Sequence, residues 1–184
     1  ARRKAGLSRP VALFMGAGFR PNWEAADALA RILAPAFPNV LFVVMGLPNE
    51  PDRAAGGAEP GPNVLWLGPV AEETKAAVFA LADVALAPMK SGTGSSLKIP
   101  EYAAHGKIVV GTPVGLRGFE ALAGQAAVVV ADDVVAALAE TLAGLERDPD
   151  GFTAACRAAR TWVERHLDWT VAAQPLLAAL ESVG

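Results

Sequence analysis

The chain has 184 residues, of which 53% are hydrophobic, and its formal net charge is −3. This composition excludes a disordered chain and is typical of a helix-rich globular domain with a sizeable core. Charges of both signs are scattered along the sequence without a basic block, which argues against nucleic acid as a partner. The single cysteine, Cys156, excludes a disulfide framework. No run of about 20 apolar residues suggests a membrane span, so we expect a cytoplasmic chain.

Short apolar runs alternate with amphipathic stretches. The apolar runs predict strands over Val11–Met15, Val40–Met45, Val64–Leu67, Asp83–Ala87, Lys107–Val110 and Ala126–Val130. The amphipathic stretches predict helices over Trp23–Leu33, Thr74–Leu81, Leu97–Ala104, Asp133–Glu146, Phe152–His166 and Thr170–Glu181. The proline-rich segment Pro48–Pro62 is predicted to be a surface loop. This alternation indicates right-handed βαβ crossovers and an α/β fold with a mostly parallel sheet covered on both faces.

Glycine-bearing loops follow most of the predicted strands. After the first strand the loop runs from Gly16 to Asn22, and Asn22 is a candidate N-cap of the next helix. Ligands of parallel sheets bind beyond the carboxyl ends of the strands, where glycine lets the backbone approach them closely. Each of these glycines has an alternative role, which is to let a strand and a helix pack tightly.

The segment from Lys90 to Gly118 carries the clearest signal for binding. Its loop Ser91–Ser96 reads SGTGSS and precedes a helix whose first turn contains Lys98, and Ser95 or Ser96 is the expected N-cap. Backbone N–H groups and the helix dipole at such a point favour phosphate. Glu101 follows Lys98 by three residues and shares its helix face. A cation for phosphate beside a carboxylate for sugar hydroxyls suits a nucleotide or a nucleotide-sugar, although similar glycine loops often only turn the chain.

The sequence resembles the C-terminal, donor-binding domain of retaining GT-B glycosyltransferases, the group 1, family 4-like enzymes. The resemblance covers nearly the whole chain and rests on FMGAGFRPNWEAADAL, LFVVMG, NVLWLGPV, LADVALAP, GTGSSLKIPEYAAHGKIVVGTPVGLRG and HLDWTVAAQPLLAAL. It implies a Rossmann-like, doubly wound parallel sheet of about six strands with helices on both faces, which is one half of a GT-B fold. Residues 1–184 are then a single domain that includes the C-terminal helices over residues 152–182.

The resemblance also implies a reaction. Such enzymes move a sugar from a nucleoside-diphosphate sugar to an acceptor, often in polysaccharide biosynthesis, and need neither a cofactor nor a metal. The sequence accordingly shows no cluster with metal-ligand spacing. The acceptor binds largely in an N-terminal domain that this sequence does not contain, so the isolated chain is expected to be inactive. Any membrane contact, peripheral at the inner membrane, is expected only through that missing domain.

Individual site residues follow from the same resemblance. Glu101 matches the second of two family glutamates and is expected to bind the nucleotide ribose, whereas the first falls on Thr93, so the usual sugar contact is missing. Lys98 and Arg20 are the candidates that stabilise the charge of the diphosphate. The other donor-binding candidates are Gly16, Gly18, Gly46, Gly68, Val70, Gly92, Thr93, Gly94, Ser95, Ser96 and Leu97.

Two alternatives remain open. The missing glutamate suggests a non-catalytic nucleotide-binding or partner-docking module of the same fold. A GT-B-like sugar-nucleotide epimerase shares the architecture but needs further acid/base carboxylates or histidines facing the sugar, and the sequence offers few. His105 and His166 lie near helix ends and are expected to be surface residues instead of bases. The base, sugar, acceptor and oligomeric state stay undetermined.

Overall fold

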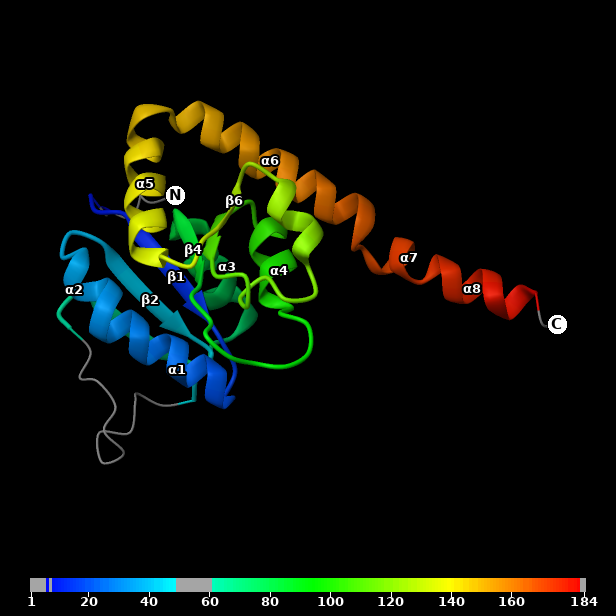
Figure 1. Cartoon of the computed structure of the whole chain (residues 1–184), viewed down its shortest axis with the longest axis horizontal. Coiled ribbons are helices and arrows are strands. Elements are labelled where there is room, and N and C mark those ends of the chain that lie inside the picture. Colours follow the sequence, from blue (N-terminus) through cyan, green and yellow to red (C-terminus); the bar gives the residue numbers. More distant parts are fainter. Residues whose placement is uncertain (1–5, 7, 49–60, 183–184) are drawn as a thin grey trace.

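The computed structural model describes residue 6 and residues 8–48 and 61–182. These residues form a six-stranded sheet in the order β3-β2-β1-β4-β5-β6, in which every neighbouring pair is parallel (Figure 1). The strands are β1 (Val11–Met15), β2 (Leu41–Met45), β3 (Val64–Gly68), β4 (Val84–Ala87), β5 (Ile108–Gly111) and β6 (Val128–Val130). The predicted Rossmann-like α/β fold is therefore confirmed, with strand bounds shifted by a residue or two. Most of the predicted loop Pro48–Pro62 lies outside the described residues.

Helices cover both faces of the sheet. One face carries α3 (Glu72–Leu81), α4 (Lys98–Ala104), the 3₁₀-helix η4 (Glu120–Gly124) and α6 (Pro149–His166). The other carries α1 (Arg20–Ala28), the π-helical turn η2 (Leu29–Leu33), α2 (Ala34–Ala36) and α5 (Val134–Arg147). Successive residues of a strand point to opposite faces of the sheet. In β1, Leu13 packs against the first set of helices and Phe14 packs against the second. This two-sided burial is why the central strands read as unbroken apolar runs.

The first helix differs from its prediction at both ends. It begins at Arg20 with Phe19 in the N-cap position, so Asn22 is not the cap. The Asn22 side chain is buried and donates to the Ala17 carbonyl at 2.9 Å. At the other end the helix passes through η2 and continues to Ala36, beyond the predicted end at Leu33. Pro35 is tolerated here because it lies in the first turn of α2, directly after the π-helical turn, where the hydrogen-bond register is shifted and a missing N–H costs less.

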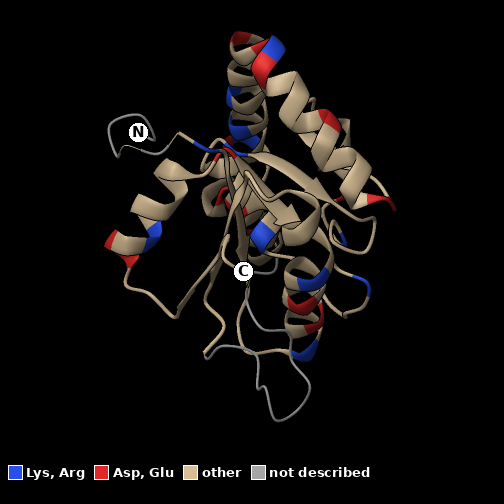
Figure 2. Cartoon of the chain, turned by 90° about the vertical axis from the view of Figure 1, so that its left-hand side faces the viewer, with Lys and Arg blue, Asp and Glu red and all other residues tan. Residues whose placement is uncertain are grey.

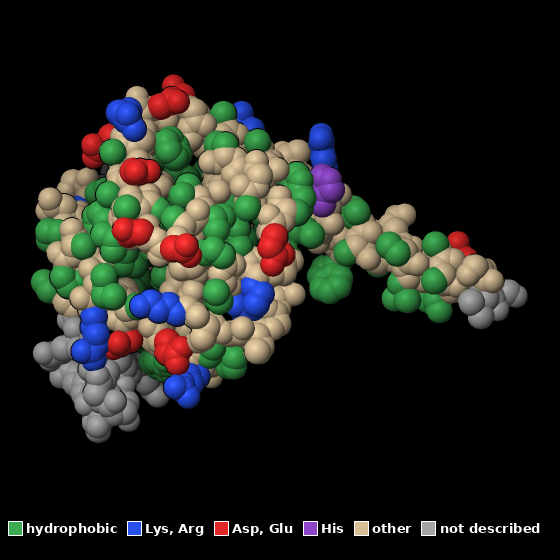
Figure 3. All heavy atoms as spheres, viewed as in Figure 1, with side chains coloured by type: hydrophobic (Ala, Val, Ile, Leu, Met, Phe, Trp, Pro, Cys, Tyr) green, Lys and Arg blue, Asp and Glu red, His purple; other side chains and the backbone are tan. Residues whose placement is uncertain are grey.

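The end of the chain forms a projecting arm. The predicted helix Thr170–Glu181 is split into α7 (Trp169–Ala172) and α8 (Gln174–Glu181), because Pro175 has no N–H to continue the hydrogen-bond ladder. The arm leaves the body beyond α6, and hydrophobic side chains are exposed along it (Figures 1 and 3). Trp169 is 86% exposed and Leu180 is 63% exposed.

Charged side chains of both signs are distributed over several helices and loops (Figure 2). In the part of the chain that the structure describes, no helix combines the length and apolar character needed to cross a membrane.

Candidate functional site

A cavity of about 540 Å³ opens at the carboxyl edge of the sheet. It lies where β1, β2, β4 and β5 end, which is where parallel α/β sheets bind ligands. The residues that line it are Met15, Gly16, Ala17, Phe19, Asn22, Gly46, Met89, Thr93, Ser95, Ser96, Leu97, Lys98, Glu101 and Arg117. Most of the predicted donor-binding positions are therefore brought together.

The floor of this cavity depends on two glycines. Gly46, after β2, has a φ of +92°, and a Cβ there would lie 2.7 Å from the Gly16 carbonyl oxygen. A Cβ on Gly16 would in turn lie 2.7 Å from the Asn22 side chain. Both glycines thus allow close packing of the chain. Because they have no side chain, they also leave their backbone uncovered on the cavity wall.

Lys98 enters the cavity from the first turn of α4. Its Nζ donates to Asn22 Oδ1 at 2.7 Å and lies 4.5 Å from the centre of the Phe14 ring. Burial lowers the pKa of Lys98 to about 8, and the positive charge of Arg117 adds to the effect. No carboxylate among the described residues pairs with this ammonium. The site therefore contains a cation that is largely desolvated and that no carboxylate in the described ranges pairs with.

The loop before α4 supplies backbone donors. Gly92 and Gly94 have φ values of +137° and +68°, which only glycine adopts readily. The N-cap position of α4 is Leu97, and no side chain caps it, so the predicted serine cap is wrong. The Ser96 N–H donates to the Arg117 carbonyl at 2.9 Å instead of to a ligand. The N–H groups of Thr93, Gly94 and Ser95 find no acceptor within the described residues, and Thr93 and Ser95 also line the cavity.

Arg117, which the sequence interpretation did not single out, holds this loop in place. Its Nε donates to the Gly94 carbonyl at 2.5 Å, and its two Nη atoms donate to Val114 and Thr93 carbonyls. A guanidinium has five N–H groups, so two remain after these bonds. In the sequence, Arg117 could have been noticed as an arginine within the glycine-containing loop after β5, residues 112–118. Only the fold, however, places that loop against Ser91–Ser96.

Glu101, in contrast to Lys98, has a partner of opposite charge. Its Oε1 accepts a charged hydrogen bond from Lys75 Nζ of α3 at 2.5 Å. The hydrogen bond to Glu101 is the largest cause of a raised pKa for Lys75. Both side chains are partly screened from solvent, with 30% and 23% of their surfaces exposed. Lys75 was also missed, because no local pattern connects α3 with α4.

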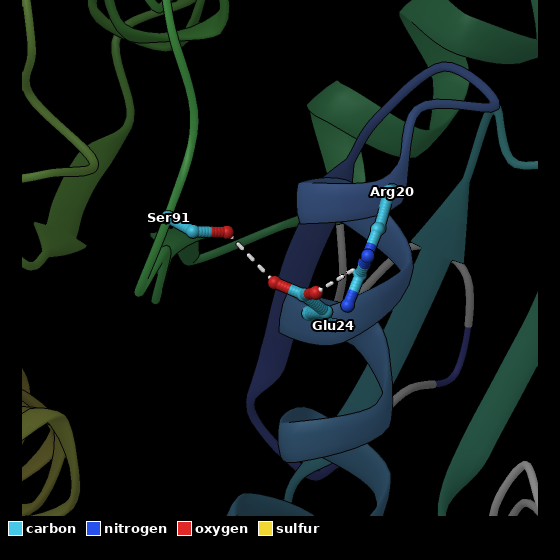
Figure 4. A network of polar contacts seen from close by, with 3 residues as sticks. All are labelled: Arg20, Glu24 and Ser91. Carbon is cyan, nitrogen blue, oxygen red and sulfur yellow. Dashed lines mark hydrogen bonds and ion pairs between the residues drawn. The ribbon is translucent and has the colours of Figure 1, made fainter.

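Arg20 does not reach the cavity lining. Its side chain is 89% exposed and pairs with Glu24 at 2.9 Å. The other oxygen of Glu24 accepts from the Ser91 hydroxyl at 2.7 Å, which ties α1 to the start of the glycine loop (Figure 4). The predicted positions Gly18, Gly68, Val70, Gly92 and Gly94 also lie outside the lining.

A larger hollow, about 660 Å³, lies beside the first, and Met89 lines both. Its wall is mostly apolar and carries Asp132 and Asp133 beside a single lysine, Lys90. The Asp133 side chain already accepts from the Ala136 N–H as the cap of α5. These carboxylates disfavour an anionic ligand, so the cavity with Lys98 is the better candidate.

Neither histidine lines the cavity. His105 stacks on Phe79 with 3.9 Å between ring centres, and burial lowers its pKa. His166 stacks on Trp162 in α6. In the described ranges no group of three or more His, Cys, Asp or Glu side chains is arranged to hold a metal ion.

Comparison with known proteins identifies the family. The family model for glycosyl transferases group 1 matches residues 9–148, so the chain belongs to that family. Phosphatidyl-myo-inositol mannosyltransferase of Mycolicibacterium smegmatis is 27% identical over 173 residues, covering 93% of this chain and 45% of that protein.

Solved structures share the fold. Sucrose-phosphate synthase from Thermosynechococcus elongatus matches 100% of this chain and 49% of its own, with a TM-score of 0.74 at 20% identity. HepE of Anabaena, solved with UDP and glucose, matches 98% of this chain and 50% of its own, with a TM-score of 0.77 at 18% identity. The chain thus spans about half the length of these proteins, and its fold is that of half a GT-B glycosyltransferase.

Proposed function

We propose that this chain is the donor-binding domain of a glycosyltransferase that takes a sugar from a nucleoside-diphosphate sugar with retention. The observation that carries the proposal is the Lys98 ammonium, which is largely desolvated and has no carboxylate partner in the described part of the chain. A buried charge is costly unless an opposite charge offsets it. A diphosphate in this cavity supplies that charge.

The wall around Lys98 suits the leaving group of such a reaction. Thr93 and Ser95, whose backbone N–H groups have no acceptor among the described residues, line the cavity together with Lys98 and Arg117. Fixed donors and cations stabilise negative charge as it develops on a departing diphosphate, without requiring a metal. Glu101, on the same wall, is the acceptor for the ribose hydroxyls, because hydrogen bonds to a carboxylate are short and strong.

A further domain for the acceptor belongs to this proposal. The chain covers about half of its relatives, and the α7–α8 arm exposes apolar side chains that a further domain would cover. Catalysis needs the acceptor held against the donor, so the isolated chain is expected to bind donor and transfer nothing. We place the protein in the cytoplasm, with any membrane contact made through the missing domain. Transfer by the isolated chain at roughly 1 per second or faster would contradict this view.

Calorimetry against UDP, GDP, ADP and their sugars tests the donor role. We expect at least one nucleoside diphosphate to bind, and Glu101→Gln to weaken it by about 1.5–3 kcal/mol, the scale of a hydrogen bond to a charged group. Glu73→Gln is the matched control, since Glu73 is exposed in the first turn of α3 and lies outside the cavity lining. If no member of the panel binds, or if Glu101→Gln binds as tightly as the wild type, the proposed site is wrong.

One observation favours a non-catalytic variant of this function. Thr93 stands in the cavity where the family glutamate is expected, and its short hydroxyl side chain cannot replace a carboxylate. A chain that binds sugar nucleotides tightly, yet supports no transfer when its complete parent protein is assayed, would establish this alternative. The epimerase alternative is less well supported, because Glu101 is the only carboxylate among the residues that line the cavity.

A further inference from the structure

Lys75 and Glu101 come from different helices and meet at the cavity wall. Lys75 lies in the first turns of α3 and Glu101 in the first turn of α4, and their Nζ and Oε1 atoms are 2.5 Å apart. Lys75 has a second acidic neighbour, Glu72, but that contact is 3.6 Å and Glu72 is 84% exposed. The short contact with Glu101 is therefore the one that sets the position of both side chains.

The contact leaves part of Glu101 free. A carboxylate offers about four acceptor positions on its two oxygens. Lys75 occupies one of them on Oε1, and no other side chain among the described residues donates to the Glu101 carboxylate. With 30% of its side-chain surface still exposed and with its place in the cavity lining, the carboxylate keeps acceptor positions for a ligand.

We propose that Lys75 is a positioning residue that fixes the Glu101 carboxylate for two neighbouring hydroxyls of the ligand's ribose; this inference rests on the proposed function. A free glutamate side chain samples several rotamers, and holding it in one of them removes an ordering cost from ligand binding. Lys75 thereby gives the site its preference for ribonucleoside over 2′-deoxyribonucleoside diphosphates, although it contributes no contact to the ligand itself.

A simpler role for Lys75 is to tie α3 to α4. A stabilising ion pair of that kind changes the melting temperature and the binding of every ligand alike. A positioning role instead changes the ratio between ribose and deoxyribose ligands, and it acts only while Glu101 is present. These two signatures separate the roles.

The experiment is calorimetry on the full chain with the matched pairs UDP and dUDP, GDP and dGDP, and ADP and dADP, and with inorganic pyrophosphate. The variants are K75M, K75R, E101Q and the double variant K75M/E101Q, with E73Q as the control, because Glu73 is exposed in the first turn of α3. We expect K75M to weaken the ribonucleotide by about five- to tenfold and to bring the ribo-to-deoxy ratio close to one. Pyrophosphate binding should be unchanged, and in the E101Q background K75M should change affinity less than about twofold.

Conservative substitution protects the test against loss of folding. K75R keeps the charge and should retain most of the ribose preference, and the ratio for each variant is independent of the folded fraction. Unchanged ratios in K75M, or equal losses for pyrophosphate and nucleotide, overturn the positioning role and leave the proposed function standing. An E101Q variant with wild-type affinity overturns the ribose role in the proposed function, and the inference fails with it.

Discussion

The Lys98 ammonium donates to the Asn22 amide oxygen at 2.7 Å, and this bond joins the start of α4 to the first turn of α1. Asn22 is itself fixed, because its amide nitrogen donates to the Ala17 carbonyl at 2.9 Å. The pair therefore holds a positive charge at a defined point over the glycine floor of the cavity. Asn22 is neutral, so it orients the ammonium and leaves its charge for a ligand.

The lowered pKa of Lys98 predicts how nucleotide binding depends on pH. Without a ligand, burial lowers the pKa of Lys98 to about 8. A bound diphosphate favours the protonated lysine and raises its pKa, so affinity is nearly constant between about pH 7 and 8 and falls by up to about tenfold per pH unit above that range. The phosphate, with a second pKa of about 6, is almost fully ionised from about pH 7 upward and adds little to this dependence. Calorimetry between about pH 7 and 9.5 measures the effect.

Lys98→Arg is the control for this pH dependence. A guanidinium stays protonated throughout the range, so the affinity of the variant should not decline with pH. A wild-type affinity that is equally flat would mean that Lys98 does not titrate in contact with the ligand.

Arg117→Gln should both weaken nucleotide binding and shift its pH profile. The substitution removes three hydrogen bonds to carbonyls, two of them in the glycine loop, and a positive charge close to Lys98. We expect a loss of about 1.5–3 kcal/mol at pH 7 and a midpoint above that of the wild type, because the lysine is then easier to protonate. Arg147→Gln, at an exposed position in the last turn of α5, is the matched control. If the midpoint of the pH profile were the same as that of the wild type, Arg117 would have no effect on the pKa of Lys98.

Arg20→Ala should affect nucleotide binding much less than a substitution at Lys98. Arg20 is exposed, pairs with Glu24 and lies outside the cavity lining. Surface ion pairs of this kind contribute about 0–1 kcal/mol. Titration of the variant with UDP and the other diphosphates checks this expectation. A loss as large as that at Lys98 would show that Arg20 moves to the diphosphate when the ligand binds, as the sequence resemblance suggests.

Gly46→Ala should destabilise the domain by roughly 2–4 kcal/mol. The added Cβ would meet the Gly16 carbonyl oxygen at 2.7 Å, and the φ of +92° disfavours any side chain. Gly124→Ala is the control, because a Cβ there meets nothing within 4 Å and its φ is not in the left-handed region. Urea denaturation followed by circular dichroism compares the two variants. Equal stabilities would contradict the role of Gly46 in the cavity floor.

The sequence predicted the parts of this molecule that depend on local patterns. Apolar runs identified the strands because β1, β2, β4 and β5 are buried on both sides. Lys98 and Glu101, which the sequence predicted to lie three residues apart on one helix, both line the cavity. What local patterns could not reveal were contacts made by packing, such as Lys75 with Glu101 and Arg117 with the glycine loop. The prediction that Asn22 caps the first helix was wrong, because its amide donates to the Ala17 carbonyl in the loop between β1 and α1.

The most direct test of the account compares UDP with uridine, or another matched pair, on the wild type and on Lys98→Met. The lysine is placed for phosphate, so the variant should lose about tenfold or more in affinity for the diphosphate and less than about twofold for the nucleoside. Thermal melting confirms that the variant is folded. Equal losses for the diphosphate and the nucleoside would show that Lys98 is a structural lysine, and the assignment of this cavity to a nucleoside diphosphate would be contradicted.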